Sequence, residues 1–213
     1  MRPLPLTILL GALAGCAGMD AAECTSADWR AIGYEDGVQG KGAAAFGPHR
    51  KACAEHGIKA DFDAYLAGRD QGVAHFCRPQ NGYQLGTQGR PDPGICPAAL
   101  EPAFLAAHAD GYGLYERGAA LDHIRRQLHH SQERARSIEY DLAQGTALLI
   151  APALLPTERA TLVIELKQLT EEKLDLEREI DQLEQDYAAA ELEYDDYRRH
   201  LAAQQGGGNL AIR

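Results

Sequence analysis

Long apolar runs and basic residues are both scarce in this chain. Beyond its first fifteen residues, no stretch approaches the roughly 18 apolar residues that a bilayer-spanning helix requires, so no membrane-spanning segment is expected there. Its 21 lysines and arginines are outnumbered by 31 aspartates and glutamates, which gives a formal net charge of −10. A negative surface repels phosphate groups, and this argues against electrostatic binding of nucleic acid or of anionic lipid.

The sequence also lacks the short motifs that mark common catalytic sites. It contains no Gly-x-Ser-x-Gly, no His-Glu-x-x-His and no glycine-rich phosphate-binding loop. The many carboxylates of its last third are typical of the solvated flank of a coiled coil. We therefore predict that the protein is not an enzyme, has no catalytic residue, and needs no cofactor.

The first sixteen residues have the layout of an export signal that ends in a lipidated cysteine. One positive charge, Arg2, precedes an apolar run from Leu4 to Leu13 that is too short to cross a bilayer. The order Leu13-Ala14-Gly15-Cys16 resembles the cleavage site of bacterial lipoproteins. We predict a signal peptide over residues 1–15 and palmitate-type acyl chains on Cys16, an anchor that several buried alkyl chains make essentially permanent.

The residue after the lipidated cysteine indicates where the anchor is placed. Ala17 stands where an aspartate would be the usual signal for retention in the inner membrane. By resemblance to this lipoprotein sorting rule, we expect the chain to be lipid-anchored on the periplasmic face of the outer membrane.

Four further cysteines lie between residues 24 and 96, and none follows. An even number of cysteines in an oxidising compartment indicates two disulfides, for which three pairings are possible; sequential pairing closes short loops and is the one we favour. His49 and His56 flank the second of these cysteines at spacings that zinc could use, but disulfide formation is the more common fate of a cysteine there, and no metal is predicted. The four cysteines are Cys24, Cys53, Cys77 and Cys96.

The same cysteine-containing region, residues 16–100, repeats a glycine motif. Glycines four positions apart recur in three stretches, and a fainter version ends at Gly111. On a helix, this spacing places the glycines on one face, where another backbone can approach closely. We favour short, tightly crossing helices, with turns and hairpins as the alternative that Asp-Gly and Asn-Gly steps leave open. The motif glycines are Gly33, Gly37, Gly68, Gly72, Gly82 and Gly86.

These motifs resemble those of a known lipoprotein family. The residues that are similar to the family are the Trp29–Gly33–Asp36-Gly37–Gly40 pattern, Cys53, Phe76-Cys77, the Gly82-Tyr83…Gly86…Gly89 run and Cys96. Over roughly residues 16–118, the chain is similar to the lipoproteins classed as domain of unknown function 2799. The resemblance implies an envelope lipoprotein, and it brings no activity, cofactor or catalytic residue with it.

The remainder of the chain is expected to form an antiparallel helical hairpin over residues 101–205. Small and apolar residues advance in steps of three and four on both sides of a proline-containing break at residues 151–156, and a glycine-rich tail, residues 206–213, is expected to be flexible. The two seams are Phe104, Ala107, Gly111, Leu114, Gly118, Leu121, Ile124, Leu128, Ser131, Ala135, Ile138 and Leu142, and then Leu162, Leu166, Leu169, Lys173, Leu176, Ile180, Leu183, Tyr187, Ala190, Tyr194, Tyr197 and Leu201. The fold class is thus predicted to be all-α.

Folding back at residues 151–156 places residue i opposite about residue 307 − i. Gly111 then meets Tyr194 and Tyr197, and Gly118 meets Tyr187 and Ala190. The flanks of the second helix are mostly acidic, and four arginines of the first helix are available to face them. Mutual repulsion of two acidic helices makes a parallel homodimer less favourable than the hairpin, while dimerisation of two hairpins stays open. These arginines are Arg125, Arg126, Arg134 and Arg136.

Two functional hypotheses follow from this organisation. The first is a structural or adaptor lipoprotein whose hairpin engages an envelope protein or the cell wall. The second is a ligand- or metal-binding head, with the hairpin as its scaffold. The apolar stretch around the break, residues 146–155, either packs the two helix ends together or forms an exposed contact for a partner.

Overall fold

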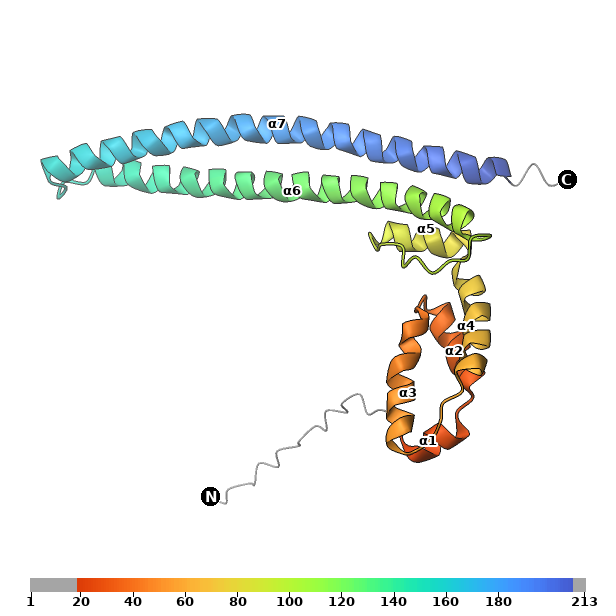
Figure 1. Ribbon diagram of the computed structural model, residues 1–213. Helices are drawn as coiled ribbons and strands as arrows, with labels where there is room; N and C mark the ends of the chain where they lie inside the picture. Colours follow the sequence, from red (N-terminus) through yellow and green to blue (C-terminus); the bar gives the residue numbers. More distant parts are fainter. Residues whose placement is uncertain (1–18, 209–213) are drawn as a thin grey trace, which may run out of the picture. The chain divides into compact units, whose positions relative to one another are not determined.

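The computed structural model describes residues 19–208, so the predicted signal peptide and Cys16 lie outside the described residues. This part of the chain consists of helices and contains no strand, which confirms the all-α prediction (Figure 1). The elements are α1 (Ala21–Ser26), α2 (Trp29–Val38), a short 3-10 turn η1 (Ala43–Ala45), α3 (Phe46–Glu55), α4 (Phe62–Phe76), α5 (Pro79–Thr87), α6 (Glu101–Leu149) and α7 (Pro156–Gly208).

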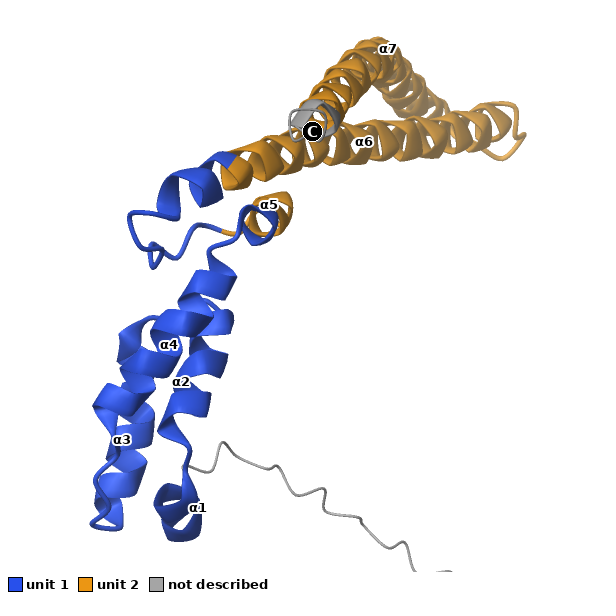
Figure 2. Cartoon of the chain, turned by 90° about the vertical axis from the view of Figure 1, so that its right-hand side faces the viewer, with its two compact units in different colours: residues 1–82, 91–106 blue, residues 83–90, 107–213 orange. Residues whose placement is uncertain are grey.

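The chain forms two compact units (Figure 2). The first contains the chain up to Gly82 together with Pro91–Ala106, and the second contains Tyr83–Arg90 together with the chain from Ala107 onward. We call them the head and the hairpin unit. The boundaries between the units pass through α5, between Gly82 and Tyr83, and through α6, between Ala106 and Ala107.

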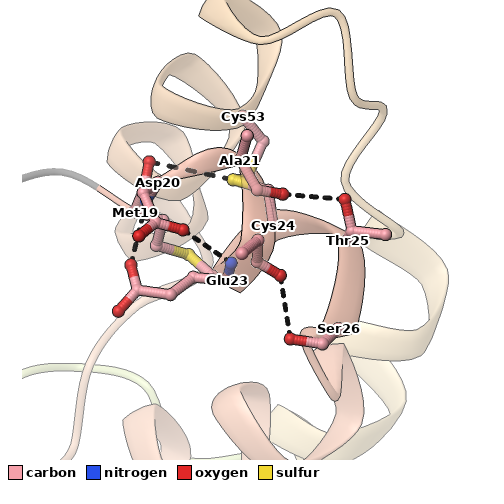
Figure 3. Close-up of a disulfide and its surroundings, with 9 residues drawn as sticks. Met19, Asp20, Ala21, Glu23, Cys24, Thr25, Ser26 and Cys53 are labelled. Carbon is pink, nitrogen blue, oxygen red and sulfur yellow. Dashed lines mark hydrogen bonds between the residues drawn. A yellow bond between two sulfur atoms is a disulfide. The ribbon is translucent and has the colours of Figure 1, made fainter.

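Two disulfides staple the head in the sequential pairing. Cys24 of α1 bonds to Cys53 of α3 with their Cα atoms 5.5 Å apart, and Cys77 bonds to Cys96 with a Cα separation of 5.6 Å. Figure 3 shows the first of these beside the start of α1, where Asp20 and Glu23 form a capping box: each side chain accepts a hydrogen bond from the other residue's backbone N–H. The disulfide thus fixes a capped but very short helix that could not persist alone.

Helices α2 and α4 cross at four of the predicted motif glycines. Gly33 and Gly37 lie buried in α2, and Gly68 and Gly72 lie buried in α4. A Cβ atom added to Gly33 would overlap the carbonyl oxygen of Tyr65, and one added to Gly68 would overlap that of Arg30. The two backbones therefore touch directly, which is the reason that glycine occupies helix interiors here despite its cost of about 1 kcal/mol relative to alanine.

A second crossing of the same kind joins α5 to the beginning of α6. Gly86 faces the carbonyl oxygen of His108, and Gly111 in turn faces the carbonyl oxygen of Tyr83, each so closely that a Cβ atom would overlap it. Gly82 lies against the backbone of Phe104, which is fully buried. All six motif glycines are thus helical and in contact with a neighbouring helix, which supports helices over turns.

The two crossings are copies of one unit. Residues of α2 recur 49 positions later in α5, so that Gly33, Gly37 and Gly40 correspond to Gly82, Gly86 and Gly89. Residues of α4 recur 39 positions later in α6, so that the fully buried Tyr65 corresponds to the fully buried Phe104. Gly72 corresponds in the same way to Gly111.

The first helix of each copy, α2 or α5, ends in the same way. Gly40 and Gly89 have positive φ angles of 77° and 66°, and each lies against an aromatic ring, of Phe76 and Tyr115 respectively. The next residue donates its backbone N–H back to the last turn, Lys41 to Asp36 at 2.9 Å and Arg90 to Leu85 at 3.1 Å. This is the pattern of a glycine-terminated helix C-cap. A side chain of the second helix then binds the carbonyl oxygen of that residue: Arg69 binds Lys41, and His108 binds Arg90.

What separates the copies is the link between their two helices. The first copy inserts η1 and α3 between Lys41 and Asp61, whereas the second passes directly through a proline-rich loop, residues 91–97. The α3 segment is therefore an addition to a repeated framework. It is also the segment that the Cys24–Cys53 disulfide fixes.

The close contact between α2 and α4 predicts how substitutions of glycine change the stability of the head. Gly68→Ala should destabilise the head by about 1–3 kcal/mol, because its new methyl group must push α2 and α4 apart. Gly47→Ala is the matched control: Gly47 is helical with no heavy atom near its Cβ direction, so alanine there should be neutral or stabilising by up to about 1 kcal/mol. Denaturant unfolding followed by the fluorescence of Trp29, the only tryptophan, measures both; equal effects would contradict the close crossing.

Candidate functional site

The two long helices pack along the predicted seams. Every residue of the two predicted seams is buried or half-buried, and the buried positions include Leu121, Ser131 and Ile138 on α6 and Leu201 on α7. Most seam residues of α7 are only half-buried. A hairpin of two helices covers one face of each, so its seam keeps solvent contact along its edges.

Side chains that pair across the seam establish its register. Ser131 donates a hydrogen bond to Glu179 at 3.2 Å, and Arg134 forms two bonds to Glu172, at 2.7 and 3.0 Å. The expected sum of 307 for facing positions is therefore correct to within a few residues. The turn spans residues 150–155, Pro156 begins α7, and α7 continues to Gly208, into the segment that was predicted to be a flexible tail. Extending a long helix requires no new nucleation, which accounts for the added turn.

The glycine contacts predicted for this seam need two corrections. Gly111 packs on Tyr83 of α5, as described above, and it is Gly113 that faces Tyr197. The Tyr197 hydroxyl donates to the carbonyl oxygen of Asp110 at 3.3 Å. Gly118 lies beside Tyr194, where an added Cβ atom would be 3.8 Å from a ring carbon, rather than beside Tyr187, because the observed register is shifted by a few residues.

Only some of the predicted arginines reach across to α7. Arg134 pairs with Glu172, and Arg125 donates to the hydroxyl of Tyr187 at 3.2 Å, whereas Arg136 pairs with Glu133 of its own helix. Arg117, which the sequence analysis did not single out, lies 4.0 Å above the ring of Tyr197 as a cation–π contact. Burial and the nearby Asp110 carboxylate raise the pKa of Tyr197. The paired charges act on register and solubility, since exposed ion pairs add little stability.

The turn of the hairpin exposes apolar side chains. Leu149, Ala151 and Leu154 are half-buried, and Gly145 lies against Leu166, so the helix ends do pack together. Other apolar residues at this end point outward, with Ile150 82% exposed. Both alternatives for residues 146–155 therefore hold in part. We call the exposed set the apolar tip: Leu148, Ile150, Leu155, Val163 and Ile164.

Arg159 holds the turn together. Its guanidinium donates to the carbonyl oxygens of Leu149, Ala151 and Leu154, which lie at the C-terminal end of α6 and in the turn. A cation is favourable at this end of a helix, where carbonyl groups lack intrahelical partners. The sequence analysis missed this residue, although a basic side chain shortly after a proline break is a signal that could have identified it.

A buried polar cluster lies in the α2–α4 crossing of the head. Asp36 is only 5% exposed and accepts hydrogen bonds from the Tyr65 hydroxyl and from the Lys41 ammonium, both at 2.8 Å. His49 of α3 lies 3.9 Å from the same carboxylate. Burial, followed by the bond to Asp36, raises the pKa of Tyr65. The second copy has Leu85 and Phe104 at the positions of Asp36 and Tyr65, so this pair is polar only in the head.

The metal-binding hypothesis requires a free Cys53 thiolate beside His49 and His56, and the folded chain does not provide it. Cys53 lies in a disulfide and supplies no thiolate, so His49 and His56 are left without the third ligand of their motif. Within residues 19–208, no three histidine, cysteine or acidic side chains come together in an arrangement that could hold a metal ion. Among the helices of the same range, none combines the length and the apolar character needed to pass through a bilayer.

These features define a class: an all-helical protein in which a disulfide-stapled pair of glycine crossings is joined to a long helical hairpin. Residues 28–113 match the model of the family described as "Protein of unknown function (DUF2799)", which confirms the family resemblance for this segment. The match begins at α2 and ends just after Gly111, so it spans both copies of the crossing. No curated protein and no solved structure matches the chain.

The Asp36–Tyr65 bond predicts how stability changes at alkaline pH. The pKa of Tyr65 is higher in the folded head than its ordinary value of about 10, so the fold favours the protonated phenol. Its stabilising contribution is complete below pH 10 and is lost as the pH rises above it, because only the unfolded chain then ionises freely. Denaturant unfolding should therefore show a larger loss between about pH 8 and pH 11 for the wild type than for Tyr65→Phe.

Tyr34→Phe is the control for this comparison. Tyr34 is an exposed phenol on α2, so its removal deletes one tyrosine without touching the buried cluster. The Tyr34→Phe variant should keep the wild-type alkaline loss. If Tyr65→Phe and Tyr34→Phe gave the same pH dependence, Tyr65 would not be the group responsible.

Proposed function

We propose that this protein is a lipoprotein anchored through Cys16 to the periplasmic face of the outer membrane, and that it acts as a structural or adaptor protein. It has no catalytic role in this proposal. The head is the membrane-proximal part, and the hairpin presents a contact to an envelope protein or to the cell wall.

The observation that carries the adaptor role is the contrast between the sides and the tip of the hairpin. Its outer faces are lined mostly by charged residues, with Leu174 and Leu192 among the exposed apolar exceptions, while Leu148, Ile150 and Leu155 expose apolar side chains together at the turn. Clustered exposed apolar residues in an otherwise polar surface are typical of a protein contact. The turn is also fixed internally by Arg159, so the contact is preorganised.

The dimensions of the hairpin fit the same role. The 49 residues of α6 extend over about 70 Å at 1.5 Å per residue. Interhelical contacts from Tyr197 near its base to Gly145 near its turn keep the two helices together over that length. A contact placed at the end of such a paired rod can reach a partner at a distance from the place where the rod begins.

Site-specific photocrosslinking in cells tests the adaptor role. A photoreactive residue at Ile150 should give one specific adduct, and a photoreactive residue at Leu192, which is also exposed and apolar but lies far from the turn along α7, should not. Adducts only between copies of the chain would indicate a homodimer instead. An adduct pattern that is the same at both positions, or no adduct at Ile150, would contradict a partner at the apolar tip.

The anchor is tested separately. Cys16→Ser should abolish incorporation of labelled palmitate and release the chain from the outer-membrane fraction, because the thiol that receives the lipid is lost. Ala17→Asp should keep the label but move the chain to the inner-membrane fraction. Label on the Cys16→Ser variant would exclude Cys16 as the lipidated residue.

A further inference from the structure

The head contains an apolar cavity that the adaptor role does not use. It has a volume of about 670 Å³ and lies along α3 and the segment that follows it. This volume falls within the range of roughly 300–1,000 Å³ that is typical of small-molecule sites. Its walls include the buried ring of Phe46, the half-buried Ile58 and the 43% exposed ring of Phe62. The cavity is therefore open to solvent on one side and apolar within.

The only charged residues that line this cavity are two cations, Arg50 and Lys59. Both are exposed, and within residues 19–208 neither forms an ion pair, although acidic residues outnumber basic ones in the chain. The nearest acidic residue along the sequence, Asp61, does not line the cavity and instead accepts a hydrogen bond from the backbone N–H of Ala64 as the N-cap of α4. Charge complementarity thus favours an occupant with an anionic group at the mouth and an apolar body inside.

The cavity belongs to the part of the head that the second copy lacks. Most of its lining comes from η1, α3 and the loop that follows α3, which lie between the two crossing helices of the first copy, and Phe62 is the first residue of α4. The framework of the crossing does not require this insertion, because α5 and α6 form the same crossing without it. A feature added to a framework that is complete without it is a reasonable place for a binding function.

The cavity also lies close to the predicted anchor. Met19 packs against the cluster that contains Phe46 and Ala60, two residues of the cavity wall. Cys16 precedes Met19 by three residues in the sequence. A lipid anchor at Cys16 would therefore bring membrane lipid to the vicinity of the cavity.

From these observations we infer that the head binds one acyl chain of an anionic lipid of the leaflet in which the protein is anchored. The apolar chain occupies the cavity against Phe46 and Phe62, and the anionic head group lies between Arg50 and Lys59. The inference rests on the proposed anchor for the source of the lipid, and on the cavity alone for its chemistry.

The indole of Trp29 provides the readout. Its centroid lies 5.7 Å from that of Phe46, so a bromine atom on an acyl chain in the cavity would quench the fluorescence of this single tryptophan. The experiment titrates the full chain carrying Cys16→Ser with a monomeric brominated long-chain fatty acid. Saturable quenching is expected, and the corresponding brominated alcohol, which has no anionic group, should bind roughly tenfold more weakly.

Matched variants locate the bound molecule. Arg50→Glu and Lys59→Glu should each weaken binding by roughly tenfold or more, whereas Lys51→Glu, which reverses an exposed charge beside the cavity without lining it, should not. Ala54→Phe should fill the cavity and remove the quenching, while Ala67→Phe on the exposed side of α4 should leave it unchanged. Because all of these residues are exposed, helical content measured by circular dichroism should stay constant in every variant.

Four results would overturn the inference, and the first three concern the quenching assay. They are an absence of saturable quenching, equal binding by all the variants, and equal weakening by Lys51→Glu and Arg50→Glu. A fourth is binding by the Cys16→Ser chain but not by the lipidated chain, which would mean that the protein's own acyl chains fill the cavity. The assay involves neither the apolar tip nor a protein partner, so its failure and the failure of the adaptor proposal are distinguishable.

Discussion

Direct contact between helix backbones at glycine is the constraint on which the family segment depends. At both crossings, glycine brings one helix against the carbonyl groups of the next, and at the α2–α4 crossing four such residues interlock. Glycine contributes no apolar side chain to the contact between α2 and α4. Close backbone approach replaces it with many short van der Waals contacts and Cα–H···O interactions, each weak and all dependent on the missing side chains. The disulfides then hold the short flanking elements to this crossing.

Repetition of the crossing explains how the copies could come to differ. Once glycine contacts and the C-cap at Gly40 or Gly89 define a copy, the link between its helices is free to vary. The first copy uses that freedom for α3, and it has the hydrogen-bonded pair Asp36 and Tyr65 at the positions where the second copy has the buried apolar residues Leu85 and Phe104. A buried carboxylate is costly unless it is satisfied, and here Lys41 and Tyr65 both satisfy it. The polar pair and the inserted helix meet at His49, so the two departures from the repeat lie together.

Features that depend on spacing along the chain could be predicted from the sequence. Contacts between distant segments could not. Glycines four residues apart indicated close helix crossings, and the heptad seams indicated the hairpin, because both patterns repeat locally. Which glycines meet could not be read in this way: Gly111 was assigned to Tyr194 and Tyr197, but α5 reaches it first. The net charge of −10 argued against anionic lipid, yet a total of this kind averages over the chain and conceals two cations at one cavity. Arg159 was missed because its partners are backbone carbonyl groups of the folded turn, and its place shortly after the proline break was the one local sign of this role.

The Cys24–Cys53 disulfide has a mechanical consequence for a chain held by its N-terminus. Tension applied from the N-terminal end enters the described residues at Met19 and would first pull on α1, a helix of six residues with little resistance of its own. The covalent bond diverts that load at Cys24 into α3, which packs through Phe46 on Tyr65 of the crossing. The force is thus distributed over several helices, and α2 does not unfold one turn at a time. Under reducing conditions the same pull would unravel the head from its end, so this bond adds resistance to extension.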